Sequence, residues 1–216
     1  VVDIHHFALL QSGRPSRAKY WWQRRRSRRN ELAFNDHDGQ VRLVYRDNHE
    51  HQTDIEEVYL QVLRSAQRRV VIANAYFFPG FRLLREIRNA ARRGVEVRLI
   101  LQGQPDMMIA KLAARMLYNY LLKAGVVIYE YCERPLHGKV ALVDEDWSTV
   151  GSSNLDPLSL SLNLEANVLI RDRAFNRELF ERLDDLSRNH CTVMPENPAP
   201  RGLLWRMTIG FMVFHF

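Results

Sequence analysis

The apolar positions of this 216-residue chain follow two alternating periods between residue 39 and about residue 190. Short apolar runs of strand length lie at 41–45, 70–77, 95–101 and 126–131. Longer stretches, in which apolar residues recur every three or four positions as on one face of a helix, lie at 53–67, 81–93 and 105–123. Because strands and helices alternate at this spacing, the pattern predicts βαβ crossovers and an α/β domain whose largely parallel sheet is flanked by helices.

The pattern changes after residue 131, where apolar runs follow one another without a long helical stretch between them. The runs at 137–143 and 148–151 are separated by a polar turn that begins at Asp144, which predicts a hairpin. A further strand is expected on the run 164–170, and a last helix at 174–189.

These patterns divide the chain into three parts. The predicted domain at 39–190 lies between a basic and aromatic segment at 1–38 and an apolar tail at 191–216. The tail follows a proline-rich break and is too short and interrupted to span a bilayer, so an interfacial anchor and packing against another part of a longer protein are the alternatives. The two cysteines, Cys132 and Cys191, are too few for a zinc site or a disulfide framework, and we expect free thiols.

A cluster of polar residues interrupts the apolar pattern at the predicted hairpin. His137 and Lys139 are two positions apart on a strand, so their side chains project from one face, and Ser152 and Asn154 repeat this spacing. The set suits a phosphodiester, because an imidazole can attack phosphorus or transfer a proton while an ammonium and neutral donors bind the oxygens. Taken singly, the alternatives are a structural histidine and an ordinary Gly-Ser-Ser-Asn turn.

The joint spacing is more specific than its parts. The residues from His137 to Asn154 fit the pattern His-x-Lys-x4-Asp-x6-Gly-Ser-x-Asn, which resembles the signature of the phospholipase D superfamily at every fixed position. The resemblance implies an α-β-α sandwich, catalytic roles for His137 and Lys139, and phosphate binding by Lys139, Ser152 and Asn154. Asp144 belongs to the same catalytic signature, although its place at the end of a hairpin suggests a structural role.

Glu165 extends the resemblance beyond the hairpin. It lies on an apolar run, where a carboxylate is costly unless it has a partner. In the phospholipase D superfamily a glutamate at this distance hydrogen-bonds the catalytic histidine, so the resemblance implies that Glu165 orients His137 in its catalytic role. The alternative is a surface or capped glutamate at the end of a strand.

The flanking residues favour one branch of the superfamily. The stretches 74–80, 134–137 and 151–165 resemble the second half of bacterial cardiolipin synthases, the B type in particular. Enzymes of the superfamily bring two such motifs together, across a pseudo-twofold axis or a homodimer, whereas this sequence contains one. We therefore expect the chain to be the C-terminal half of a longer protein, with the second motif in the N-terminal half or in a homodimer mate.

The resemblance implies phosphatidyl transfer between two phosphatidylglycerol molecules, with release of glycerol through a phosphohistidine intermediate. His137 is the expected general acid and base, and the histidine of the second motif is the expected nucleophile. No metal and no cofactor are implied, because two Lys/Asn sets neutralise the phosphate. The alternatives are a phospholipase or nuclease that uses water as the acceptor, and a non-catalytic half that only binds membranes.

The positive charge of the chain is concentrated in one place. The net charge is +6, and eight of the 31 basic residues, with no acidic residue among them, lie between Arg14 and Arg29. Aromatic rings beside basic residues suit the surface of an anionic membrane, with a solvated linker as the second reading and nucleic acid as the least favoured. We expect phospholipid contact, at the cytoplasmic side of a bacterial cell membrane, from Tyr20, Trp21, Trp22, Arg24, Arg25 and Arg26.

Overall fold

The computed structural model describes residues 40–104 and 108–195, except for the side chains at 108–113. The basic segment at 1–38 and the tail beyond Pro195 lie outside the described residues. The predicted membrane contact therefore stays a prediction for all of its residues, namely Tyr20, Trp21, Trp22, Arg24, Arg25 and Arg26.

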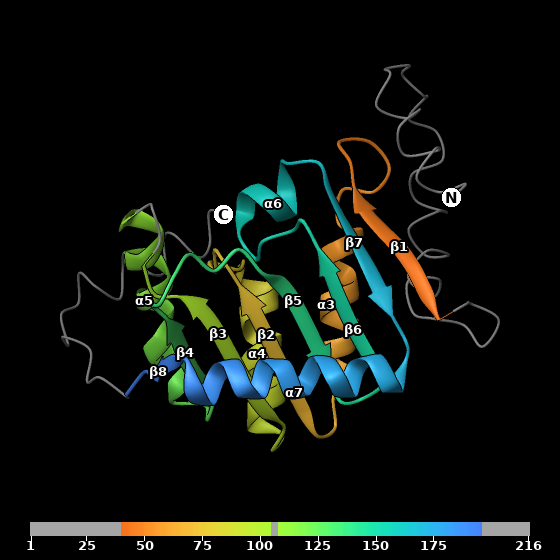
Figure 1. Ribbon diagram of the computed structural model, residues 1–216. Helices are drawn as coiled ribbons and strands as arrows, with labels where there is room; N and C mark the ends of the chain where they lie inside the picture. The colour runs from red at the N-terminus through yellow and green to blue at the C-terminus, as the bar shows by residue number, and fades with distance from the viewer. Residues whose placement is uncertain (1–39, 105–107, 196–216) are drawn as a thin grey trace.

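Eight strands form one sheet in the order β1-β7-β6-β5-β2-β3-β4-β8 within the described part of the chain (Figure 1). The strands are β1 (Val41–Arg46), β2 (Arg69–Asn74), β3 (Glu96–Gln102), β4 (Val127–Tyr131), β5 (Lys139–Val143), β6 (Trp147–Gly151), β7 (Glu165–Ile170) and β8 (Cys191–Val193).

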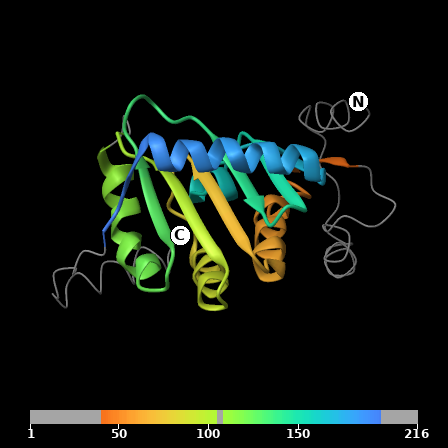
Figure 2. The ribbon, with the colours of Figure 1, turned by 60° about the horizontal axis from the view of Figure 1, so that its bottom comes forward.

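The helices cover both faces of this sheet. They are α3 (Asp54–Ser65), α4 (Phe81–Arg92), α5 (Met108–Leu122), α6 (Pro157–Ser161) and α7 (Arg173–Asn189). Figure 2 shows α7 lying across the strands on the face opposite α3, α4 and α5. The predicted α-β-α sandwich with a mixed sheet is confirmed.

The prediction that the sheet is largely parallel is wrong. Only β2–β3 and β3–β4 are parallel, and the other five pairings are antiparallel. The parallel pairs arise where α4 and α5 carry the chain back across the sheet. Strands β5, β6 and β7 follow one another without a helix long enough to cross the sheet, so each reverses direction.

Alternate side chains of β2 pack into the two helical layers on opposite faces of the sheet. Val70 and Ile72 belong to the large apolar cluster that also contains the buried apolar residues of α3 and α4. Val71 and Ala73 face the other way and pack in the smaller cluster that contains Leu183 of α7. A continuous apolar run on this strand is therefore what burial on two faces requires.

Most element boundaries agree with the sequence pattern. Gly94 and Gly125 follow α4 and α5 with φ of 90° and 92°, a left-handed conformation that glycine adopts without strain. The predicted strand at 70–77 is shorter, since β2 ends at Asn74. Two short elements, α6 and β8, were not predicted. No helix among the described residues is long and apolar enough to cross a membrane.

Candidate active site

The predicted motif lies along one edge of the sheet, which is uppermost beside α6 in Figure 1. Antiparallel pairing brings the end of one strand next to the start of its neighbour. In this way Asn74 at the end of β2 pairs with Lys139 at the start of β5. Arg46 at the end of β1 likewise pairs with Glu165 at the start of β7. Residues far apart in the sequence therefore converge on a single edge.

His137 and Lys139 are neighbours at this edge. The loop before β5 is held by two hydrogen bonds, from the Leu136 amide to Gln102 Oε1 at 3.0 Å and from the Ala75 amide to the Gly138 carbonyl at 3.1 Å. The Nζ of Lys139 lies 3.3 Å from both ring nitrogens of His137 and donates to the His137 carbonyl at 3.1 Å. His137 is exposed, whereas Lys139 is buried.

Two carboxylates act on the ammonium of Lys139. Burial lowers the pKa of Lys139, and the negative charges of Glu165 and Asp156 raise it. Burial also raises the pKa of Asp156, an effect that its hydrogen bonds from the amides of Ser159 and Leu158 oppose and the charge of Glu165 reinforces. Asp156 caps α6 by accepting from the Ser159 amide at 3.0 Å. Asp156 was not predicted as a site residue, although an Asp-Pro pair is a typical start of a helix.

Glu165 has a different partner from the one that the resemblance implied. Its carboxylate accepts a hydrogen bond from the Ser152 hydroxyl, which in turn accepts from the Ala166 amide at 3.0 Å. Among the described residues there is no hydrogen bond between Glu165 and His137. The Ser152 amide donates to the Ala166 carbonyl at 3.0 Å, so Ser152 extends the hydrogen-bond ladder between β6 and β7. Its side chain lies beside Glu165 on the neighbouring strand. Ser152 is thereby fixed beside the carboxylate.

Buried amide side chains hold the turn that follows β6. Asn167 Oδ1 accepts from the Ser153 amide at 3.3 Å, and Asn74 Oδ1 accepts from the Leu155 amide at 3.2 Å. Their Nδ2 groups, and Oδ1 of half-buried Asn154, have no hydrogen-bond partner among the described residues. Asn74 and Asn167 were not predicted as site residues. The available signal was that each is a polar residue on a largely apolar, buried strand.

The glycine of the motif is required by a close approach of two strands. A Cβ at Gly151 would lie 2.1 Å from Asn167 Oδ1 and 2.5 Å from the Ala166 carbonyl oxygen. Carbon and oxygen cannot approach so closely, and the backbone oxygen cannot move away. A glycine here therefore lets the turn that carries Ser152 and Asn154 lie against β7.

Asp144 does not lie with the other motif residues, and its catalytic role stays a prediction beside the structural role that its hairpin position suggested. It follows β5 at the end opposite Lys139, with φ of 55°. Its carboxylate accepts from the amides of Gln67, Arg68 and Arg69 at 3.0, 2.8 and 2.9 Å. Through these three hydrogen bonds the Asp144 carboxylate joins the β5–β6 turn to the start of β2, which is a structural role.

Apolar side chains surround the site on the side of α6. Leu158, Leu162 and Leu164 are 61%, 62% and 48% exposed. They lie in the connection between Asn154 and Glu165, which contains no charged residue between Asp156 and Glu165. We call these three residues the leucine rim.

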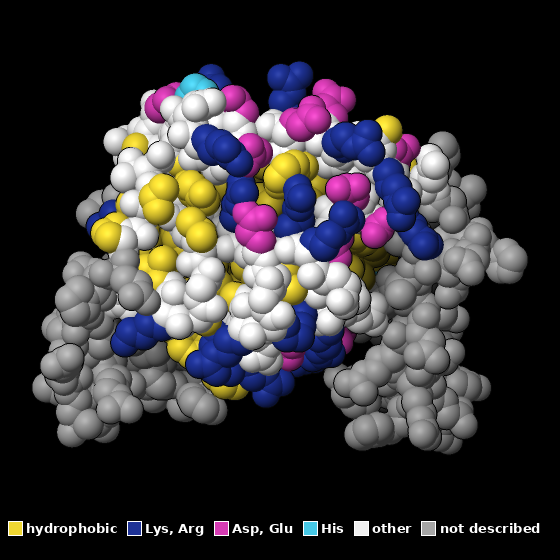
Figure 3. Space-filling view, turned by 90° about the horizontal axis from the view of Figure 1, so that it is seen from below, with side chains coloured by type: hydrophobic (Ala, Val, Ile, Leu, Met, Phe, Trp, Pro, Cys, Tyr) yellow, Lys and Arg dark blue, Asp and Glu magenta, His cyan; other side chains and the backbone are white. Residues whose placement is uncertain are grey.

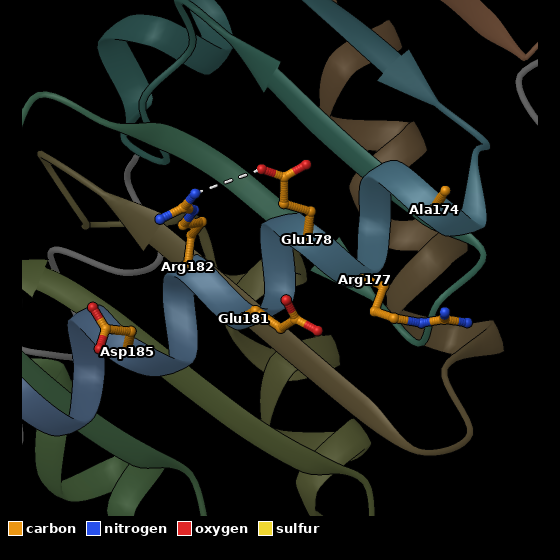
Figure 4. Close-up of a pocket in the computed structure, with 6 residues that line it drawn as sticks. All are labelled: Ala174, Arg177, Glu178, Glu181, Arg182 and Asp185. Atoms are coloured by element: carbon orange, nitrogen blue, oxygen red, sulfur yellow. Dashed lines mark ion pairs between the residues drawn. The ribbon is translucent and has the colours of Figure 1, made fainter.

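The opposite side of the molecule, as far as the structure describes it, carries apolar and charged side chains together. Figure 3 shows basic and acidic side chains interspersed on the face seen from below. A shallow hollow along α7 is lined by such side chains, of which Arg182 and Glu178 form an exposed ion pair at 3.7 Å (Figure 4). Exposed ion pairs of this kind contribute little to stability. No group of three potential metal ligands occurs in the part of the chain that the structure describes.

Comparisons with known proteins agree on one family. Residues 59–186 match the family model described as cardiolipin synthase, PLD-like domain. The chain is 53% identical over 218 residues to cardiolipin synthase B of Salmonella typhi, and 53% identical over 216 residues to that of Escherichia coli (strain K12). Both matches cover 100% of this chain and 52% of the relative, so the chain spans about half the length of these curated relatives.

Solved structures share the fold. Nuc from Salmonella typhimurium, a phospholipase D family member, has a TM-score of 0.60 at 23% identity and covers 71% of this chain and 97% of its own. Phosphatidylserine synthase of Haemophilus influenzae has a TM-score of 0.56 at 17% identity and covers 94% of this chain and 54% of its own.

Proposed function

The chain belongs to the family of cardiolipin synthases with a phospholipase D-like domain, and we propose that it carries one half of an active site for phosphatidyl transfer. The observation that carries the proposal is the contact of buried Lys139 with His137, at 3.3 Å, on the edge that also holds Ser152 and Glu165. An imidazole beside a fixed ammonium suits attack on, or proton transfer to, a phosphodiester.

The proposed reaction has two steps and uses two histidines. In the first step the histidine of a second motif attacks the phosphorus of phosphatidylglycerol, and the glycerol oxygen leaves with a proton from His137. In the second step His137 takes a proton from a hydroxyl of another phosphatidylglycerol, whose oxygen displaces the histidine. The products are cardiolipin and glycerol, and His137 ends in its initial protonation state.

The other polar groups have supporting roles in this proposal. Lys139 and Asn154 bind the phosphate oxygens, because an ammonium and a neutral donor stabilise the charge that develops on them. Ser152 adds a further donor when its hydroxyl turns from Glu165 to the phosphate. Glu165 holds Ser152 in place by accepting its hydroxyl hydrogen. The unpartnered Nδ2 groups of Asn74 and Asn167 support an anion site here, since buried donors without partners are rare.

The leucine rim favours a lipid substrate over nucleic acid. Three exposed leucines within a few residues of Asn154 and Glu165 place apolar surface next to the phosphate-binding groups. A phospholipid joins acyl chains to its phosphate through a short glycerol unit, so it offers apolar and charged parts at this spacing. The second candidate, a phosphodiesterase with water as the acceptor, is supported by the exposure of His137. Phosphatidic acid as the product distinguishes it from the transferase.

The proposed partners are anionic phospholipid and a second motif, supplied by another half of the protein or by a homodimer mate. The curated relatives are about twice as long as this chain, which leaves room for such a half in them. We further propose a peripheral place at the cytoplasmic side of the bacterial cell membrane, with the basic and aromatic segment at 14–29 against the lipid headgroups.

The experiment that tests the function replaces His137. In the enzyme that contains both motifs, His137→Ala is expected to abolish cardiolipin formation from phosphatidylglycerol vesicles while the circular dichroism spectrum stays unchanged. His190→Ala is the matched control, because His190 is exposed and contacts Glu133 at 2.9 Å, outside the site. Normal turnover by the His137 variant would refute the assignment.

A further inference from the structure

Arg46, the last residue of β1, is a buried arginine beside the active site with no role in the proposed reaction. Its side chain is 3% exposed, although arginine is rarely buried because its charge is costly to remove from water. Within the described residues its Nε has no hydrogen-bond partner. The cost of burial must therefore be offset by its two Nη groups and by the negative charges around it.

Both Nη groups bind the connection that leads from α6 into β7. Nη1 donates to the Asn163 carbonyl at 2.6 Å and to Asn48 Oδ1 at 2.9 Å, and Nη2 donates to the Ser161 carbonyl. Ser161 is the last residue of α6, where carbonyl groups lack partners inside the helix. Arg46 therefore ties the end of β1 to residues 115 and 117 positions away in the sequence.

Arg46 also lies beside Glu165. The two residues are directly opposite in the β1–β7 register, so their side chains share one face of the sheet, with Cβ atoms about 5 Å apart. Burial lowers the pKa of Arg46, and the charges of Asp47 and Glu165 raise it. Since arginine keeps its charge in proteins, Glu165 has a permanent positive charge next to it.

We propose that Arg46 is a positioning residue of the active site, which fixes the α6–β7 connection and places a positive charge beside the carboxylate of Glu165. This inference rests on the proposed function, because the place of Glu165 affects turnover only if His137 and Lys139 react there. Arg46 has no hydrogen bond to either of those two residues in the described structure. Its effect on the reaction therefore passes through Glu165.

The first test needs no turnover and uses this chain. The amides of Leu162 and Asn163 donate to the Leu158 carbonyl at 2.9 and 2.8 Å, directly beside the carbonyls that Arg46 binds. In Arg46→Met, which keeps an apolar stem, these amides should exchange with deuterium roughly tenfold faster than in the wild type. Unchanged exchange would overturn the inference.

The matched control is another arginine of the sheet. Arg98 on β3 is 12% exposed and pairs with Asp184 at 2.5 Å, on the face that α7 covers. Arg98→Met should lower the thermal stability without a selective increase of exchange at Leu162 and Asn163. Faster exchange at these two amides in both variants would mean general destabilisation and would also overturn the inference.

The second test is a double-mutant cycle in the enzyme that contains both motifs. Arg46→Met should lower kcat roughly 10- to 100-fold, as loss of a group that orients a reactive residue often does, with KM within about twofold. Arg46→Lys should recover part of the rate because it keeps the charge. In a Glu165→Gln background, Arg46→Met should cause no further loss.

Two outcomes of the cycle are decisive. Losses that multiply in the double variant would mean that Arg46 acts independently of Glu165, which overturns the inference. If the wild-type enzyme cleaves no phosphodiester at all, the proposed function fails, and the exchange measurement alone then decides whether Arg46 holds the α6–β7 connection.

Discussion

Lys139 is a charged residue of the site that solvent hardly reaches. It is 7% exposed, and its ammonium is close to the carboxylates of Asp156 and Glu165. A charge that is shielded from water attracts a phosphate more strongly than an exposed lysine does. The same burial lowers the pKa of Lys139, so this lysine loses its proton at a lower pH than an exposed one.

This environment predicts a pH dependence of substrate binding. As pH rises through the lowered pKa of Lys139, the positive charge disappears and KM for phosphatidylglycerol should increase, by roughly tenfold for the loss of about 1.4 kcal/mol. In Lys139→Arg the increase should move to higher pH, because a guanidinium keeps its proton. The measurement is KM between pH 7 and 10 for both forms. An identical alkaline increase in the arginine variant would contradict this role of Lys139.

The sequence predicted some site residues and missed others for a physical reason. The convergence of His137, Lys139, Ser152 and Glu165 could be predicted, because they lie at short sequence spacing on neighbouring strands and the loops beside them. The place of Asn74 or Arg46 depends on which strands pair and in which register, and their partners lie 65 or more positions away. The Ser152–Glu165 hydrogen bond joins residues only 13 positions apart, but it too depends on the register of β6 against β7.

At the scale of elements, the β5–β6 hairpin links the active-site edge to the opposite end of the sheet. Asp144 begins the turn in a left-handed conformation. Its carboxylate accepts hydrogen bonds from the amides of the first residue of β2 and the two residues before it. This linkage fixes the register of β5 against β2, on which the pairing of Lys139 with Asn74 depends.

Loss of the Asp144 carboxylate should therefore affect stability and spare the chemistry. Asp144→Ala should lower the free energy of unfolding by about 1–3 kcal/mol, because three amides lose their acceptor and alanine is strained at positive φ. Asp144→Asn should lower the free energy of unfolding by less, since asparagine tolerates this conformation.

Asp146→Ala is the control, because Asp146 forms only an exposed ion pair with Arg173 at 2.9 Å. Thermal denaturation and kcat of the folded enzyme are the measurements. A large fall in kcat for Asp144→Ala, with unchanged stability, would contradict the structural role and support a catalytic one.

The leucine rim yields a prediction that separates lipid from soluble substrates. Leu158→Ser with Leu162→Ser should raise KM for phosphatidylglycerol vesicles more than about tenfold, since each leucine contributes roughly 1–2 kcal/mol when it enters an apolar phase. Cleavage of bis(4-nitrophenyl) phosphate should stay within twofold of the wild type. Val41→Ser is the control, because Val41 is 63% exposed at the other end of β1. Equal losses on both substrates would refute the proposed lipid contact.

Among the elements, the helices and strands with a clear period were predictable, whereas the sheet topology was not. The α4 and α5 crossovers follow from alternating periods, and their parallel pairs were predicted correctly. The pairing of β1 with β7 joins segments more than 100 residues apart, and no local period contains that information. The three-residue strand β8 is too short to show a period.

At the scale of the whole molecule, the described edge of the sheet carries one histidine of the motif, His137. A phosphohistidine route needs one histidine that attacks and a second that protonates the leaving oxygen. The proposed reaction therefore requires a second motif facing this edge, and the greater length of the curated relatives is consistent with that requirement. The exposed position of His137 leaves it accessible to such a partner.

The most direct test of the central claim is an analysis of lipid products by mass spectrometry. Phosphatidylglycerol vesicles are incubated with this chain together with a half that carries the second motif, and with the same pair containing His137→Ala. We expect cardiolipin and free glycerol from the first mixture and neither from the second. Phosphatidic acid in place of cardiolipin, or equal cardiolipin in both mixtures, would contradict the central claim.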